Sequence, residues 1–171
     1  MNTTRGLKLI GKGAFTKCYQ LNDTTVLLKS EDPIKECMAH GWFPDSDLFP
    51  KVEFSSIDGC YEMEYFPRVR SLKNNLDPDQ YQIYKDLREV FNNLETSMNI
   101  YDGLNLIYKS FCQIENEELQ ETMIEALHSC GNYGSDVGFE ISPRNVAVKN
   151  GKLILLDVFF MKSVLNKVRS K

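Results

Sequence analysis

Apolar and polar residues alternate over short runs in the first part of the chain, and turn residues separate the runs. This pattern is typical of antiparallel strands. We expect strands over residues 7–10, 17–21, 24–29, 51–54 and 59–65. Asn22-Asp23 and Asp58-Gly59 have the composition of hairpin turns. Between the third and fourth runs, residues 33–41 predict a short helix that begins at a proline and ends at a glycine.

From about residue 75 the apolar residues recur at helical spacing. Asp77 followed by Pro78 is a typical helix start, and one face of the following helix carries Tyr84, Leu87, Phe91 and Leu94. A second helix is expected over residues 102–112. A third helix is expected to begin near Asn116, and a short one to span residues 161–171. The residues that mark one stripe of the third helix are Leu119, Met123 and Leu127.

Glycines interrupt the chain after the third predicted helix, and a hairpin follows them. We expect its strands over residues 145–148 and 153–156, joined by Asn150-Gly151. The pattern as a whole predicts an α+β protein with a sheet-rich N-lobe, residues 1–66, and a helical C-lobe, residues 67–171. The late hairpin is expected to line a cleft between the two lobes.

Composition sets the class of protein. The chain has 171 residues, of which 42% are hydrophobic and 26% charged, as in ordinary globular proteins. Its net charge of -4 gives no basic field for nucleic acid, and no apolar run approaches membrane-spanning length. The five cysteines are scattered without a CxxC pair, so we expect buried, reduced thiols and a cytoplasmic location.

Candidate chemistry gathers around the late hairpin. Glu140 precedes Asn145 by five residues, and Asp157 follows Asn145 by twelve. Carboxylate and amide oxygens at these positions are suited to a Mg-nucleotide site, with a further carboxylate facing an incoming hydroxyl group.

The N-lobe contains further candidates, each with an ordinary structural explanation. Gly11 and Gly13 allow close backbone approach to phosphates, although they also suit a plain hairpin turn. Lys29 ends an apolar strand and is a candidate phosphate ligand or a solvated lysine, and Glu36 is its candidate partner or a solvated helix residue. The segment Glu64-Tyr65-Phe66 offers its backbone to an adenine ring, or is simply a linker.

In this order, the motifs resemble the protein kinase fold. Gly11-Lys-Gly13 is similar to the glycine-rich loop, although Thr16 stands in place of the third glycine. Val26-Leu-Leu-Lys29 is similar to the VAIK strand, and Met63-Glu64-Tyr65 to the gatekeeper and hinge. Asn145 resembles the catalytic-loop asparagine and Asp157 the DFG aspartate. The chain also resembles the short, divergent Ser/Thr protein kinases of tailed bacteriophages.

The resemblance implies a set of roles and two cofactors, ATP and Mg²⁺. Lys29 would contact the α- and β-phosphates and pair with Glu36, and the backbone amides of residues 64–66 would contact adenine. Asn145 and Asp157 would bind Mg²⁺, and Glu140 would act as the catalytic base.

The chain also departs from the family pattern. Gly138-Phe-Glu140 stands in place of His-Arg-Asp, and Ser142 replaces the lysine that serves the transferred phosphate, a role for which Arg144 is a candidate. Val158 follows Asp157 without the glycine of DFG. Fourteen residues follow Asp157, so we expect a minimal bilobal kinase-like fold that lacks the distal C-lobe helices.

Three functions agree with these features. The first is an ATP- and Mg-dependent Ser/Thr protein kinase that acts on host or partner proteins. The second is a weak or inactive pseudokinase that works by binding a partner protein. The third is a small-molecule phosphotransferase, which the early helical segment between hinge and catalytic loop favours.

Overall fold

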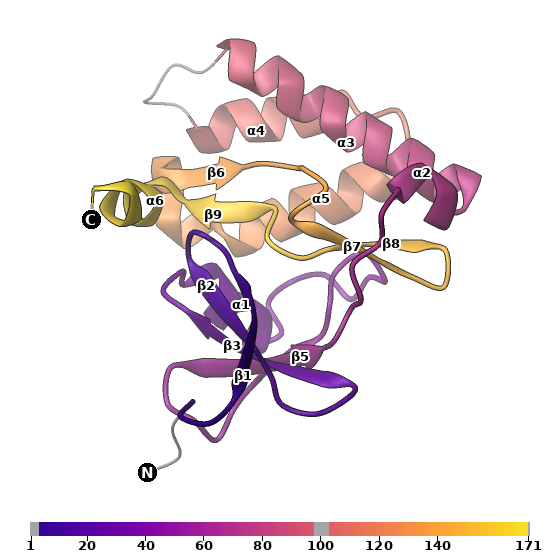
Figure 1. Cartoon of the computed structure of the whole chain (residues 1–171). Helices are drawn as coiled ribbons and strands as arrows, with labels where there is room; N and C mark the ends of the chain where they lie inside the picture. Colours follow the sequence, from indigo (N-terminus) through magenta and orange to yellow (C-terminus); the bar gives the residue numbers. More distant parts are fainter. Residues whose placement is uncertain (1–3, 98–102, 171) are drawn as a thin grey trace.

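A computed structural model describes residues 4–97 and 103–170 of the chain, and its fold is α+β (Figure 1). The N-lobe contains a five-stranded antiparallel sheet in the order β1-β2-β3-β5-β4. Its strands are β1 (Lys8–Lys12), β2 (Thr16–Gln20), β3 (Thr25–Ser30), β4 (Val52–Phe54) and β5 (Cys60–Glu64). All five strands predicted from the alternating pattern are therefore confirmed, with boundaries that differ by one or two residues.

Helix α1 (Ile34–Ala39) follows β3 and covers one face of the sheet. Pro33 precedes its first residue, and Gly41 ends the segment in a left-handed conformation with φ of 72°. Met38 of α1 packs against side chains of β3, β4 and β5 to form the small N-lobe core. The buried residues of this core are Val26, Leu28, Met38, Val52 and Met63.

Helices dominate the C-lobe. They are α2 (Leu72–Asn75), α3 (Pro78–Ser97), α4 (Gly103–Phe111), α5 (Glu117–Ser129) and α6 (Lys162–Arg169). The predicted face of α3 packs into the core, and the Asn116 side chain caps α5 by accepting a hydrogen bond from the Leu119 amide at 3.0 Å. The short α2 was not predicted. Residues 102 and 171, which the predicted helices include, lie outside the described residues.

Two small sheets stand between helices α3 and α4 and the N-lobe (Figure 1). The predicted hairpin forms as β7 (Val146–Lys149) and β8 (Lys152–Leu155). Asn150 and Gly151 join its strands with φ of 51° and 81°, as a type I′ turn requires. A 3-10 segment, η1 (Gly131–Asp136), leads into β6 (Val137–Phe139), which pairs with β9 (Phe159–Met161). Neither β6 nor β9 was predicted.

The main hydrophobic core fills the C-lobe, with Leu87, Phe111, Met123 and Leu153 among its fully buried side chains. Ile34 of α1 also belongs to this core, although its helix covers the N-lobe sheet. Burying such a side chain contributes on the order of 1.5–3 kcal/mol. Helix α1 is therefore shared between the two cores, and this sharing fixes its position against β4 and β9.

The structure answers two further predictions. All five cysteines are free, but Cys112 is exposed, which corrects the expectation that every thiol would be buried. In the part of the chain that the structure describes, no helix combines the length and apolar character that crossing a membrane would require.

Candidate functional site

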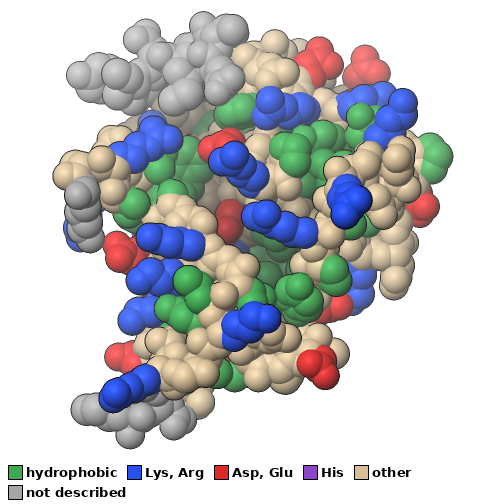
Figure 2. Space-filling view, in the orientation of Figure 1, with side chains coloured by type: hydrophobic (Ala, Val, Ile, Leu, Met, Phe, Trp, Pro, Cys, Tyr) green, Lys and Arg blue, Asp and Glu red, His purple; other side chains and the backbone are tan. Residues whose placement is uncertain are grey.

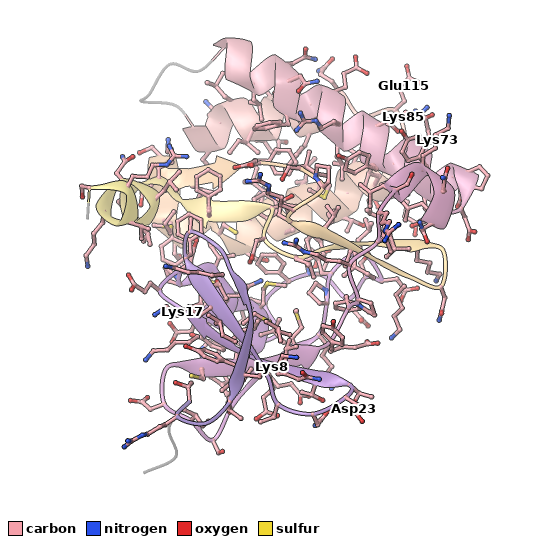
Figure 3. All side chains as sticks on the ribbon, in the orientation of Figure 1. Lys8, Lys17, Asp23, Lys73, Lys85 and Glu115 are labelled. Carbon is pink, nitrogen blue, oxygen red and sulfur yellow. The ribbon has the colours of Figure 1, made fainter. Side chains whose placement is uncertain are left out.

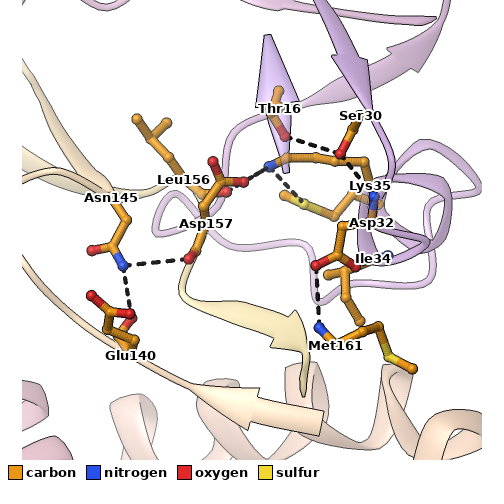
Figure 4. Close-up of polar contacts among 11 residues, drawn as sticks. Thr16, Ser30, Asp32, Ile34, Lys35, Glu140, Asn145, Leu156, Asp157 and Met161 are labelled. Atoms are coloured by element: carbon orange, nitrogen blue, oxygen red, sulfur yellow. Dashed lines mark hydrogen bonds and ion pairs between the residues drawn. The ribbon is translucent and has the colours of Figure 1, made fainter. Parts of the chain in front are cut away.

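Asn145 holds together the two segments that carry the late polar residues (Figure 4). Its side-chain Nδ2 donates to the backbone carbonyl of Glu140 at 3.0 Å and to that of Asp157 at 3.4 Å. Its Oδ1 accepts a hydrogen bond from the backbone amide of Ser142 at 2.7 Å. The loop after β6 is thereby tied to the end of β8. Glu140, Asn145 and Asp157 thus lie together, as their spacing in the sequence predicted.

Lys35 of α1 faces this group from the N-lobe (Figure 4). Its Nζ lies 2.8 Å from Oδ1 of Asp157 and donates to the backbone carbonyl of Leu156 at 2.6 Å. The Lys35 residue is only 3% exposed, whereas the Asp157 side chain is 45% exposed. A buried ammonium group is tolerated only with partners of this kind. Lys35 is therefore the cation of the site, and the sequence analysis did not identify it.

Lys29, the lysine predicted for this role, lies outside the site. It is exposed on β3 and stands opposite Lys17 and Cys60. Because side chains alternate along a strand, Lys29 and Ser30 point to opposite faces. Ser30 is on the side of the site, since its hydroxyl group is 2.9 Å from that of Thr16, which lines the cavity beside Asp157.

Glu36 is the second correction. It is exposed on α1, and its nearest described ionic partner is His40, at 3.9 Å, rather than Lys29. On this helix the buried positions are Ile34, Lys35, Cys37 and Met38. The helix therefore turns Lys35 toward the C-lobe and Glu36 toward solvent, so of the two alternatives for Glu36 the solvated helix residue is the one that agrees with the structure.

The glycine segment forms the hairpin between β1 and β2. The Gly13 amide donates to the Thr16 carbonyl at 2.8 Å, so this amide closes the turn. A Cβ atom at Gly13 would come no closer than 3.7 Å to another atom, and at Gly11 no closer than 3.5 Å. Packing therefore requires glycine at neither position.

The predicted hinge is only partly available to a ligand. The Tyr65 amide donates to the Thr24 carbonyl at 2.9 Å, and the Glu64 carboxylate pairs with Lys149 at 2.7 Å. Phe66 packs against the N-lobe core, and its amide has no hydrogen-bond partner among the described residues. Of the three predicted adenine-contacting amides, that of Tyr65 is thus already used.

The space between Lys35, Asp157 and the β1–β2 hairpin is small. The cavity there has a volume of about 10 Å³, roughly what one water molecule needs. Phe15, at the tip of the hairpin, stacks on Phe160 of β9 with ring centroids 5.8 Å apart. The hairpin is therefore closed over the site, and a nucleotide requires it to move.

A second buried charged residue, Asp32, lies beside Lys35 (Figure 4). One carboxylate oxygen accepts from the Ile34 amide at 2.9 Å, and the other from the Met161 amide at 3.2 Å. Burial raises the pKa of Asp32, and these two hydrogen bonds oppose that shift. The sequence contained a signal for this residue, because an aspartate just before a proline is typical of a helix start.

Of the predicted magnesium pair, Asp157 is the side chain with an exposed carboxylate that could contact a metal ion. Within residues 4–97 and 103–170, no group of three or more His, Cys, Asp or Glu side chains could hold a metal ion. Asp157 offers a half-exposed carboxylate, and Mg²⁺ commonly uses one or two carboxylates together with substrate phosphates. Asn145 is less available, since its Oδ1 already accepts from Ser142.

Comparisons of the chain with known protein families, with curated proteins and with solved structures found no match. The assignment of function therefore rests on the geometry of the site.

Proposed function

We propose that the chain is an ATP- and Mg-dependent phosphotransferase of the Ser/Thr protein kinase type, acting on hydroxyl groups of proteins. One observation carries the proposal. A buried lysine on the N-lobe side pairs with Asp157, directly beside the Asn145-braced loop that presents Glu140. A cation, a carboxylate and an exposed acid at one junction are the groups that phosphoryl transfer requires.

The proposal gives Lys35 the role that the sequence analysis assigned to Lys29. Lys35 neutralises the phosphate charge from helix α1, and Asp157 holds the metal ion that accompanies the phosphates. Asn145 keeps the Glu140 loop in register with Asp157. Glu140 is exposed and orients the acceptor hydroxyl group. ATP with Mg²⁺ supplies the phosphoryl group.

Transfer of label from γ-labelled ATP to lysate proteins, or to the chain itself, tests the proposal. Wild-type protein with Mg²⁺ should incorporate label. Lys35→Met and Asp157→Ala should each lower the rate on the order of 100-fold or more, as loss of a preorganised charge does. Lys29→Met is the matched control and should stay within about twofold of wild type, because an exposed side chain on the far face contributes little.

Two outcomes would contradict the proposal. One is the absence of labelling under conditions where ATP binds. The other is the reverse order of the lysine variants, with Lys29→Met inactive and Lys35→Met active, which would return the role to the strand lysine.

The closed cavity favours a second candidate, a pseudokinase that binds a partner without chemistry. In this reading the Lys35–Asp157 pair is a permanent bridge between the lobes, and the cavity of about 10 Å³ stays closed. Thermal shift separates the two candidates. A rise in melting temperature with ATP only when Mg²⁺ is present supports the enzyme, and no rise with either supports the binding protein.

A further inference from the structure

Three lysines stand directly opposite one another across three neighbouring strands of the N-lobe sheet. Lys12 of β1 is paired in register with Lys17 of β2, and Lys17 is paired with Lys29 of β3. Residues opposite each other on antiparallel strands share a face, so all three side chains project together. We call this set the lysine row. It lies on the face of the sheet opposite Ser30 and the Met38 side of α1.

The lysine row is exposed, and β5 carries Glu62 on the same face, diagonal to Lys29. In the described part of the chain, no carboxylate lies within 4.0 Å of the ammonium group of Lys12, Lys17 or Lys29. Other exposed lysines do have partners. Lys51 pairs with Glu53 at 2.8 Å, and Lys152 pairs with Asp47. Figure 2 shows several basic side chains on the visible face of the N-lobe, and Figure 3 labels Lys17 there.

Such a row opposes folding. Like charges directly opposite on neighbouring strands repel one another and destabilise the sheet. The hydrophobic residues of β2 and β3 form the sheet without the lysines, because the apolar side chains that pack against α1 lie on the other face. Lysine on an edge strand such as β1 also discourages pairing with other chains. Lys17 and Lys29 lie on inner strands, where a ligand of opposite charge would offset the repulsion.

We propose that the lysine row is a docking surface for an acidic segment of a partner protein. Neighbouring strands are about 4.8 Å apart, so the three side chains span about 10 Å. Same-face side chains of an extended peptide recur about every 6.8 Å, so the span fits two or three carboxylates. β1 is an edge strand of the sheet, which leaves the row open on one side to an approaching chain.

Two other occupants agree less well with the charges. A nucleic acid needs many phosphate contacts, whereas the row provides three on a chain of net charge -4. A second copy of the chain could offer the exposed acids of α5, among them Glu117, Glu118 and Glu121. That contact would join different surfaces of the two copies, and such contacts form open chains unless the rotation closes them.

Fluorescence anisotropy with a labelled octaglutamate peptide tests the docking surface, at about 50 mM salt, where screening is weak. Wild type should bind the peptide, with affinity that falls as salt rises. The triple variant Lys12→Gln, Lys17→Gln, Lys29→Gln should bind at least about tenfold more weakly. The matched control Lys51→Gln, Lys73→Gln, Lys152→Gln removes the same charge from exposed lysines elsewhere. It should stay within about twofold of wild type.

A stability measurement completes the test. The melting temperature of the triple row variant should equal or exceed that of wild type, because the repulsion is removed. Lys17→Gln alone, at the centre of the row, should weaken binding about threefold. This single variant replaces the triple variant in the test if the triple variant fails to fold. The shift in melting temperature with ATP and Mg²⁺ should be unchanged in the row variants, so failure of this proposal and failure of the phosphotransferase proposal are distinguishable.

Four results would overturn the docking proposal. The first is that wild type does not bind octaglutamate, and the second is that the row variant and the matched control are weakened equally. The third is that wild type binds an octathymidine oligonucleotide more tightly than octaglutamate. The fourth is that wild type self-associates in sedimentation and the row variant does not. The last two would identify a nucleic acid or a second copy as the occupant.

Discussion

At the residue scale, two buried charges, Asp32 and Lys35, connect the N-lobe to the C-lobe. Both lie at the start of α1, and both reach backbone groups of the other lobe. Asp32 accepts from the Met161 amide, and Lys35 donates to the Leu156 carbonyl. A buried charge costs free energy unless its hydrogen bonds are complete, so each of these contacts specifies one position of α1 over the site.

Asp32 predicts a definite dependence of stability on pH. Burial raises its pKa, so the folded protein keeps the proton to a higher pH than the unfolded chain does. Between the ordinary aspartate pKa, about 3.9, and the raised pKa, the contribution of Asp32 to the free energy of unfolding falls as pH rises. That contribution is fully present only below the ordinary pKa. Asp32→Asn has no carboxyl group and lacks this trend.

Urea unfolding of wild type and Asp32→Asn at a series of pH values from about 4 to 7 measures the effect. The stability of wild type relative to Asp32→Asn should be greatest at the acid end and should decline toward neutral pH. A gap that widens as pH rises would contradict the prediction. It would mean that the two amide hydrogen bonds, and not burial, dominate the pKa of Asp32.

The sequence located some residues of the site and not others, for physical reasons. Glu140, Asn145 and Asp157 were found because the turn at Asn150-Gly151 fixes which residues oppose each other. Lys29 was chosen because it ends the apolar run 26–28. All three residues of that run are buried, so it carries no alternation that would show which face the lysine is on. Lys35 was missed because a helix of six residues is too short for its buried face to be read from periodicity.

At the element scale, strand β9 is packed between the β1–β2 hairpin and strand β6. Phe160 of β9 stacks on Phe15 from the hairpin. On the other side, Phe160 lies over Gly138 of β6, its register partner. A Cβ atom at Gly138 would lie 2.5 Å from the Phe160 ring, closer than real contacts allow. The absence of a side chain at Gly138 therefore determines where the ring sits beneath the hairpin.

Gly138→Ala should lower the free energy of unfolding by about 1–3 kcal/mol, because the added methyl group forces the Phe160 ring to move. The double variant Gly138→Ala, Phe160→Ala should lose less than the sum of the two single variants, because the clash is gone. Chemical denaturation of the four proteins gives the coupling free energy.

Gly131→Ala is the matched control, since a Cβ atom there meets nothing within 4 Å. It should change stability by no more than about 0.5 kcal/mol. Strict additivity of Gly138→Ala and Phe160→Ala would show that the ring is not held by Gly138.

Element length decides which parts of the fold the sequence could predict. The strands of the N-lobe and the helices α3 and α5 have clear turns or caps and several residues of periodic pattern. Strands β6 and β9 have three residues each, as β4 does, but the Asp58-Gly59 turn marked β4, whereas β6 follows glycines that suggested a loop. Helix α2 has four residues and no buried side chain, so it leaves no periodic trace in the sequence.

At the scale of the whole molecule, the N-lobe core is too small to be stable alone. It contains five buried residues, far fewer than the C-lobe core. A small sheet needs packing against a helix or another core for stability. Here α1 supplies the link, through Ile34 in the C-lobe core and the polar contacts of Asp32 and Lys35. The two lobes should therefore unfold as one unit.

Two probes test this cooperativity in urea. Trp42, the one tryptophan of the chain, stacks on His40, whose ring also contacts Phe54 of β4. Its fluorescence therefore reports on this side of the N-lobe and on its junction with α5, where the Trp42 carbonyl accepts from Ser129. Far-UV circular dichroism reports mainly on the helices, the longest of which is α3 with 20 residues. In wild type the two transitions should coincide in midpoint and slope.

Removing the buried polar contacts of α1 should separate the fluorescence and dichroism transitions. In the double variant Asp32→Ala, Lys35→Ala the fluorescence transition should come at lower urea than the dichroism transition, because the small core then unfolds first. The matched control Lys51→Ala, Asp58→Ala removes one exposed charge of each sign from the N-lobe and should keep the transitions together. Separate transitions in wild type would contradict the link. Coincident transitions in the Asp32→Ala, Lys35→Ala variant would assign it to the apolar contacts between the lobes, among them Ile34, Phe43 and Phe49. Because the site lies between the lobes, this cooperativity also determines whether the hairpin can open for a nucleotide while the N-lobe stays folded.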